Sequence, residues 1–205
     1  MLKNLKSWGL MSVTYEKTSV NGSKSQILFI DIETTGLNAW YGDKVTCICA
    51  KTLDNSLNFK KCDEDEFKLL ACFSGWLKNF DETTLLVHAN GKEFDIPFLC
   101  ARACLIFNEN DFAKKILNFR KQFDLCTDIT FGEWGKISLN KLAKIYNVPQ
   151  KIAKGTDAIR WFAQKEFKLI EEYCWADVLT TEAVYLKFLE LKRGDESAKD
   201  KNRTC

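Results

Sequence analysis

The sequence predicts an α/β fold in which a mixed five-stranded sheet is flanked by helices. Three strand-like segments come first, at 26–34, 45–50 and 56–60, and segments that alternate between helix and strand follow them. The chain then shows helical spacing of apolar residues over long stretches up to residue 191. Sequential strands pair as hairpins, whereas strands joined through a helix run parallel, so a chain of this kind builds one mixed sheet.

Composition is that of an ordinary globular protein with one hydrophobic core. Of the 205 residues, 46% are hydrophobic and 28% are charged. This length predicts one main domain. The composition of the two ends predicts an N-terminal arm or extra hairpin at 1–25 and a flexible charged tail at 193–205, so the domain is expected at 26–192. The net charge of +2 does not indicate a polyanionic partner, so any nucleic-acid surface has to be a local patch.

Apolar spacing and turn residues define the individual elements in chain order. The first strand is a continuous apolar run that ends at the turn T-T-G-L, residues 34–37. Helices are predicted where apolar residues recur at helical spacing. Acidic residues in the first turn support the helix at 63–79, and Pro97 suits the first turn of the next helix. The later predicted strands are 45–50, 56–60, 84–88 and 123–129, and the predicted helices are 63–79, 97–105, 139–146, one from 157 onward and 167–191.

Nine cysteines indicate an intracellular protein with reduced thiols. Their number is odd, no C-x-x-C pair occurs, and most lie in apolar periodic segments. Structural zinc sites usually show close ligand pairs, and His88 is the single histidine, so the spacing does not favour zinc. The segment M-L-K-N-L-K-S-W-G-L lacks the apolar stretch of a signal peptide, and no segment has transmembrane length. We therefore expect a cytoplasmic, reducing location and no membrane partner.

The first strand carries an acidic pair, Asp31 and Glu33, whose side chains share one face because strand side chains alternate. Two like charges at the end of a core strand are unfavourable unless a positive group compensates them. Backbone donors or a lysine are one solution, and a metal ion is the other. Gly36 then permits a sharp turn, and the N–H groups of such a turn can receive a phosphate or a sugar hydroxyl.

A second motif follows the fourth predicted strand, in H-A-N-G-K-E-F-D-I-P-F-L, residues 88–99. Asp95 stands just before a proline, so it is either a helix N-cap or a carboxylate that faces the same cleft as the first strand. Asn90 is either a turn residue beside Gly91 or part of that cleft. His88 is interpreted as a histidine at the end of a strand rather than as a ligand.

The third motif is E-Y-C-W-A-D-V-L, residues 172–179. Tyr173 and Asp177 are four positions apart, so on a helix they lie on one face, one above the other. The same spacing fits an amphipathic helix with a half-buried tyrosine and a solvated aspartate.

In this order, the motifs D-x-E, N-x-x-x-F-D and Y-x-x-x-D resemble those of the DEDD superfamily of 3′→5′ exonucleases, whose fold is RNase H-like. Tyrosine in the last motif is typical of the DEDDy subgroup, which includes polymerase proofreading domains and RNase D. In the other subgroup a histidine would stand at the position of Glu172. The resemblance covers about residues 26–192 and implies an RNase H-like sheet and a metal-dependent nuclease.

The resemblance implies hydrolysis of phosphodiester bonds with two divalent metal ions. It assigns Asp31, Glu33 and Asp177 to the ion that activates water, with Asp31 bridging to a second ion that Asp95 holds directly or through water. Carboxylate oxygens suit Mg²⁺ or Mn²⁺. Tyr173 is expected to position the water by a hydrogen bond, because a phenol has a pKa near 10 and is a poor base.

The resemblance also implies contacts to the substrate. Thr34, Gly36 and Leu37 are expected at the terminal nucleotide, with Leu37 packing on the last base, and Asn90 and Phe94 are expected to line the same cleft.

Other residues are candidates for nucleic-acid contact on their own chemistry. Trp40 and Tyr41, in the loop after the first strand, would either stack on unpaired bases, at about 1–3 kcal/mol per base, or anchor the loop as hydrophobic residues. An excess of positive charge at 136–160 fits either a phosphate track or a solvated helix face. The charged residues there include Lys136, Lys141, Lys144, Lys151, Lys154 and Arg160, with Asp157 as an acidic member.

These observations predict a 3′→5′ exonuclease acting on single-stranded 3′ ends. The polymerase-like flanks of the first two motifs favour DNA over RNA, and a replication or repair protein is a possible partner. The alternatives are an exoribonuclease of the RNase D type, an accessory subunit of a polymerase, and a non-catalytic nucleic-acid-binding module on the same fold. A missing carboxylate would favour the non-catalytic module, but all four are present.

Overall fold

The computed structural model describes residues 26–107, 111–117, 119, 121–129, 136–150 and 153–201, with side chains as far as residue 192. The predicted arm at 1–25 lies outside these residues. The strands are β1 (Ile27–Thr34), β2 (Val45–Thr52), β3 (Asn58–Cys62), β4 (Leu85–His88) and β5 (Lys121–Asp124). The helices are α1 (Glu66–Leu77), α2 (Asp95–Phe107), α3 (Asp111–Leu117), α4 (Leu125–Asp128), α5 (Leu139–Ile145), α6 (Gly155–Ala163) and α7 (Phe167–Lys201), and η1 (Ala39–Tyr41) is a 3₁₀ turn.

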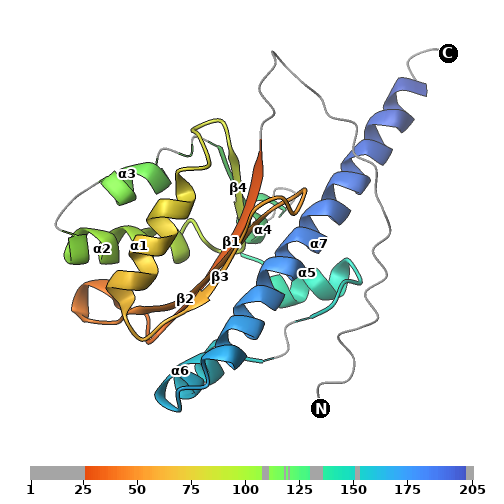
Figure 1. Cartoon of the computed structure of the whole chain (residues 1–205). Helices are drawn as coiled ribbons and strands as arrows, with labels where there is room; N and C mark the ends of the chain where they lie inside the picture. The colour runs from red at the N-terminus through yellow and green to blue at the C-terminus, as the bar shows by residue number, and fades with distance from the viewer. Residues whose placement is uncertain are drawn as a thin grey trace.

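The sheet lies between two layers of helices (Figure 1), with α1, α2 and α3 on one face and α5, α6 and α7 on the other. Its strand order is β3-β2-β1-β4-β5. The pairs β1–β2 and β2–β3 are antiparallel, whereas β1–β4 and β4–β5 are parallel. This arrangement confirms the predicted mixed five-stranded α/β sheet and places β1 at its centre.

The side chains of β1 divide between two cores. Leu28, Ile30 and Ile32 pack toward α1 and α2, where an apolar cluster fills the space under that layer. Phe29 points to the opposite face and joins the cluster under α7. Because strand side chains alternate, Asp31 and Glu33 share the face of Phe29, under α7. The position of these two carboxylates therefore follows from the alternation of β1.

Several boundaries differ from the sequence prediction. The strand predicted at 123–129 ends at Asp124, because the Asp124 side chain accepts a hydrogen bond of 3.0 Å from Cys126 N and caps the short helix α4. The short helices η1 and α3 were not predicted. The last helix, predicted to end at 191, continues to Lys201, through most of the segment that we expected to be a flexible tail.

A buried ion pair joins the first helical layer to the sheet. Arg102 of α2 donates to both carboxylate oxygens of Glu66 on α1, at 2.9 and 2.6 Å. The same arginine donates to the carbonyl of Ala39 in η1 at 3.0 Å, and Glu66 also accepts from the backbone N–H of Val45 at 2.8 Å. These bonds tie two helices, one strand and the loop after β1 together, so the loop leaves the strand in a fixed direction.

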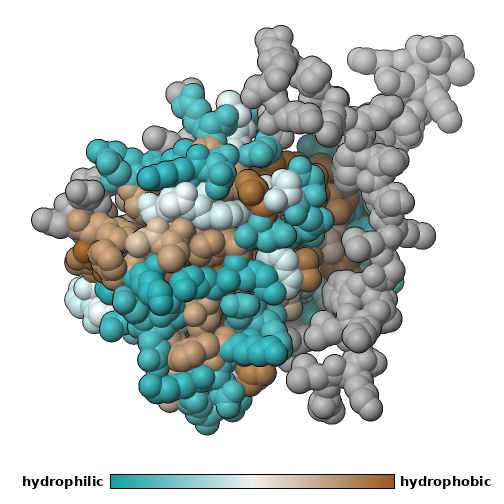
Figure 2. Space-filling view, in the orientation of Figure 1, coloured by the Kyte–Doolittle hydropathy of each residue, from teal (hydrophilic) through white to brown (hydrophobic). Residues whose placement is uncertain are grey.

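Polar and apolar side chains are mixed on the surface. The face shown in Figure 2 is largely hydrophilic, with apolar side chains gathered over the α2 side of the molecule. Within the described part of the chain, no helix combines the length and the apolarity needed to cross a membrane.

Candidate active site

A pocket of about 530 Å³ opens where the end of β1, the start of α2 and one face of α7 meet. Its lining includes residues from all three sequence motifs: Asp31, Glu33, Asn90, Phe94, Asp95, Tyr173 and Asp177. Segments that are up to 146 positions apart in the chain therefore contribute to one cavity. The fold thus joins the motifs as the resemblance implied, and their individual roles stay predictions.

The acidic pair of β1 lies toward the end of the antiparallel pairing between β1 and β2. Asp31 lies opposite Cys49 and Glu33 opposite Cys47 on β2, and the register shifts directly after Glu33. A carboxylate oxygen of Asp31, one of Glu33 and the sulfur of Cys174 all lie within 4.8 Å of one another. Glu33 is only 8% exposed, so two like charges stand close together in a largely desolvated place.

Asp95 is the first residue of α2 and is buried against β1. Its Oδ1 accepts a hydrogen bond of 3.1 Å from the backbone N–H of Ile32, which lies between the two acidic residues of the strand. This bond fixes the start of α2 to the strand and brings a third carboxylate to the pocket. An N-cap role alone, the alternative prediction, does not account for this long-range contact.

The turn before α2 depends on two residues with special backbone requirements. Asn90 has φ 67°, in the left-handed region that asparagine tolerates better than most residues. A Cβ atom on Gly91 would lie 2.5 Å from the imidazole carbon of His88, so the close approach requires glycine. The backbone carbonyl of Asn90 accepts from the N–H of Phe94 at 3.1 Å, which positions both Phe94 and Asp95.

Asp124, at the end of β5, holds this turn in place. Its carboxylate accepts from the backbone N–H of Asn90 at 2.8 Å and from that of Lys92 at 3.2 Å. Burial would raise the pKa of Asp124, but the imidazole of His88 and the N–H donors of Asn90 and Cys126 hold it below its usual value. The sequence signal for this residue is an aspartate at the end of a strand, which we did not assign to the site.

His88 is the last residue of β4 and is fully buried. Its Nδ1 lies 3.1 Å from the backbone nitrogen of Gly91 and 3.4 Å from Asp124 Oδ2, and its Nε2 lies 3.3 Å from Gln122 Oε1. The histidine thus supports the turn from below, in line with its interpretation as a strand-end residue.

Helix α7 presents Tyr173 and Asp177 to the pocket from one face, and each is 1% exposed. The Tyr173 ring packs edge-on against Trp161 of α6, with centroids 6.0 Å apart and planes at 71°. The alternative prediction of a half-buried tyrosine and a solvated aspartate is wrong, because the sheet covers this face of the helix.

The pocket is also lined by one positively charged residue that we did not predict as a site residue. Lys136 lines the cavity, and its Nζ lies 3.2 Å from Asn90 Oδ1 and also contacts the carboxylate of Glu93. We had placed this lysine only in the general basic segment. Ser138, Asn140 and Gly155 line the same wall.

The turn T-T-G-L lies outside the pocket lining. Thr34 is buried and donates to the carbonyl of Gly36 at 2.6 Å. A Cβ atom on Gly36 would lie 2.4 Å from a carboxylate oxygen of Asp43, so this position requires glycine for packing. The Asp43 carboxylate also accepts from the N–H of Asn38 at 2.8 Å, so it occupies one of the loop's backbone donors.

Three large apolar side chains near this turn are exposed, namely Leu37 at 78%, Trp40 at 65% and Tyr41 at 92%. None of them belongs to the pocket lining. The alternative role of Trp40 and Tyr41 as buried loop anchors is wrong, because neither ring is covered. Contact of all three with nucleic acid stays a prediction.

Comparison with known proteins identifies the superfamily to which this chain belongs. The family model of the RNase H superfamily matches residues 28–189, which include the whole sheet and the pocket. The chain belongs to the RNase H superfamily. No curated protein matches this sequence.

Among solved structures, this RNase H-superfamily chain is similar to the family B DNA polymerase from the hyperthermophilic archaeon Pyrobaculum calidifontis. The two share 21% sequence identity with a TM-score of 0.63 over 82% of this chain. The match spans 25% of the polymerase chain, so the present chain corresponds to about a quarter of that protein. At this identity the likeness shows a shared fold.

Proposed function

We propose that this protein is a 3′→5′ exonuclease that hydrolyses phosphodiester bonds at single-stranded 3′ ends, with DNA preferred over RNA. Membership of the RNase H superfamily supports a nucleic-acid hydrolase. The observation that carries the proposal is the pocket itself, which gathers the four carboxylates of the sequence motifs together with Tyr173.

The donor set of the pocket fits two divalent cations of the Mg²⁺ or Mn²⁺ class. All four acidic side chains offer hard oxygen atoms, and buried like charges of this kind favour a cation in their midst. Asp31, Glu33, Asp95 and Asp177 would hold the ions. When bound, such ions supply positive charge at the phosphate and lower the pKa of a water molecule.

The protein's own groups would orient the reactants. We assign Tyr173 to a hydrogen bond that holds the attacking water, because phenols are ordinarily protonated at neutral pH and are poor bases. Asp95 is anchored to β1 by its bond from Ile32 N–H, so its position relative to Asp31 is fixed before substrate arrives. Packing of Tyr173 on Trp161 restricts the tyrosine in the same way.

A positive charge at the pocket and exposed aromatic rings in the loop after β1 fit a nucleic-acid strand. Lys136 would meet a phosphate at the rim. The exposed rings of Trp40 and Tyr41 belong to η1, in the loop after β1, and would stack on unpaired bases near the terminus. The basic residues of 136–160 would continue the contact along the strand.

The proposal is tested by a time course on substrates labelled at the 3′ or the 5′ end, as single-stranded DNA, single-stranded RNA and duplex, with Mg²⁺, Mn²⁺ or a chelator. We expect stepwise shortening from the 3′ end, faster on single-stranded DNA, which the chelator abolishes. Asp31→Ala, prepared in the same way, controls for contaminating nucleases. Internal cuts, shortening from the 5′ end, or wild-type rates in the Asp31→Ala protein would each contradict the proposal.

A further inference from the structure

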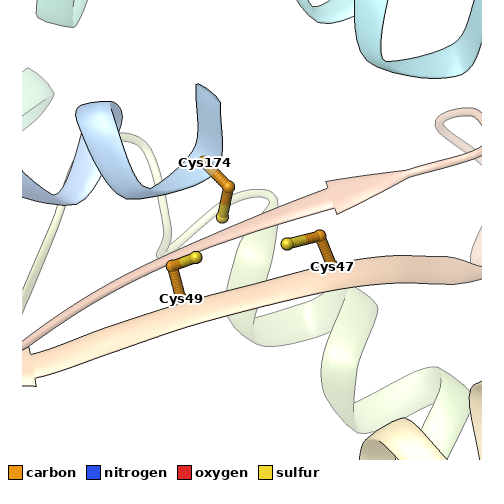
Figure 3. A group of neighbouring side chains, drawn as sticks. All are labelled: Cys47, Cys49 and Cys174. Atoms are coloured by element: carbon orange, nitrogen blue, oxygen red, sulfur yellow. The ribbon is translucent and has the colours of Figure 1, made fainter. Parts of the chain in front are cut away.

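Three cysteines meet beside the carboxylate pocket, under the same helix. The sulfur atoms of Cys47, Cys49 and Cys174 all lie within 4.8 Å of one another, and the three side chains are fully buried. Figure 3 shows them pointing toward one another, Cys47 and Cys49 from strand β2 and Cys174 from helix α7 above it. We call this group the thiol cluster. No sequence motif indicated the thiol cluster, because 125 positions separate Cys49 from Cys174.

We propose that the thiol cluster is a binding site for a soft, closed-shell cation of the Zn²⁺ or Cd²⁺ class, distinct from the carboxylate pocket. Metal–sulfur bonds of about 2.3 Å place three ligand sulfurs roughly 3.8–4.0 Å apart. The cluster needs to close by less than about 1 Å to reach that spacing. Thiolates select such cations over Mg²⁺ and Mn²⁺, which prefer oxygen. Binding replaces up to three S–H protons by the cation and releases these protons to solvent.

One positively charged side chain lies next to the cluster, on the opposite side from the acidic pair's strand β1. Three thiolates and one divalent cation leave a net charge of −1. Lys60 lies directly opposite Cys49 on β3, on the same face of the sheet, and its Nζ is 4.7 Å from the ring centroid of Trp175. A fourth thiol, Cys62, lies directly opposite Cys47 on β3 and interacts with its side chain, so it is a further sulfur donor beside the cluster.

The thiol cluster touches the proposed catalytic site through Cys174. Its Sγ donates to the backbone carbonyl of Asp31 at 3.3 Å and lies within 4.8 Å of carboxylate oxygens of Asp31 and Glu33. Loss of the thiol proton to a metal would remove the first contact and place a further cation, beyond the two proposed in the pocket, beside the acidic pair. We expect occupancy of the cluster to slow Mg²⁺-dependent hydrolysis at least 10-fold. This expectation rests on the proposed nuclease function.

Binding is tested without reference to nuclease activity. The full chain is reduced, freed of metal, and titrated with Cd²⁺ in a large excess of Mg²⁺, so that Mg²⁺ occupies the carboxylates. We expect sulfur-to-cadmium charge-transfer absorption that saturates at one equivalent with the intensity of at least three thiolates. Because the cluster is fully buried, a second sample is refolded in the presence of Cd²⁺, so that slow entry does not hide a site.

Variants and a wild-type measurement locate the ligands. Cys47→Ser, Cys49→Ser and Cys174→Ser are each expected to remove about one third of the absorption, whereas Cys72→Ser, at an exposed position of α1, should leave it unchanged. Cadmium-113 NMR of the wild type, which needs no folded variant, should give one resonance in the range of sulfur ligation.

Three outcomes would overturn the site: a resonance in the range of oxygen ligands, the intensity of a single thiolate, or a signal that Mg²⁺ suppresses. Each would assign the cation to Asp31, Glu33 and Cys174 instead. No absorption in either sample would also overturn it, and would leave the proposed nuclease untouched.

Discussion

The two faces of the sheet differ in chemistry although they are built from the same strands. On the face of α1 and α2, the central strands contribute mainly apolar side chains, such as Ile30, Ile32 and Ile48. On the face of α7, positions of the same strands carry carboxylates and thiols beside apolar side chains such as Phe29. The first face is a conventional core, and the second combines a core with a reactive site.

This difference indicates a division of labour across β1. The apolar face is well packed, with tilted and stacked contacts among Phe59, Phe73, Trp76 and Phe80, and it can stabilise the strand on its own. The α7 face then holds close like charges that oppose folding until a cation balances them. Substitutions on the two faces should therefore separate stability from activity.

The largest effect is expected from Phe73→Ala on the apolar face. Phe73 is fully buried and contacts the rings of Phe59, Trp76 and Phe112, so truncation should lower the free energy of unfolding by about 3–5 kcal/mol. The matched change Phe67→Ala, at a ring that is 57% exposed, should lower it by about 1 kcal/mol. Denaturant unfolding measures both. Loss of nuclease rate per folded molecule in Phe73→Ala would contradict the division of labour.

On the opposite face, Asp177→Asn should affect activity rather than folding. Removing one preorganised carboxylate is expected to lower the hydrolysis rate by roughly 100- to 1000-fold. The free energy of unfolding without divalent ions should stay within about 1 kcal/mol of wild type, because the change also relieves crowding of like charges. Glu190→Gln, at an exposed position of the same helix, serves as the control. A large loss of stability together with a retained rate would reverse our assignment of this face.

The free energy of unfolding is expected to depend on pH through Asp124, which holds the turn between β4 and α2. Its folded pKa lies below the unfolded value of 3.8, so its contribution to stability is complete above that pH and is lost as the pH falls through the folded pKa. Asp124→Asn should lower the free energy of unfolding at pH 7 by about 1–3 kcal/mol and flatten its fall in acid. Thermal unfolding between pH 7 and pH 2 measures this. Asp111→Asn, at a carboxylate that is 87% exposed, should follow the wild-type curve.

Local pattern and spacing predicted one part of the site, and contacts distant in sequence made up the rest. The alternation of β1 and the i, i+4 spacing on α7 placed Asp31, Glu33 and Asp177 on the correct faces, because both are local periodicities. The capping of α4 by Asp124, the bond from Ile32 to Asp95 and the meeting of the thiols depend on how strands and helices pack. Sequence spacing does not encode these contacts, and it therefore gave no sign of the thiol cluster.

The smallest effect is expected from Tyr173→Phe, which separates the two roles of one side chain. The ring packs on Trp161 and belongs to the core under α7, whereas the hydroxyl is assigned to the attacking water. Loss of one hydrogen bond of about 0.5–1.5 kcal/mol predicts a 2- to 13-fold lower rate with little change in stability. Single-turnover hydrolysis of a 3′-labelled strand measures the chemical step. A loss as large as that of Asp177→Asn would indicate that the phenol transfers a proton, and Tyr173 would then be a base.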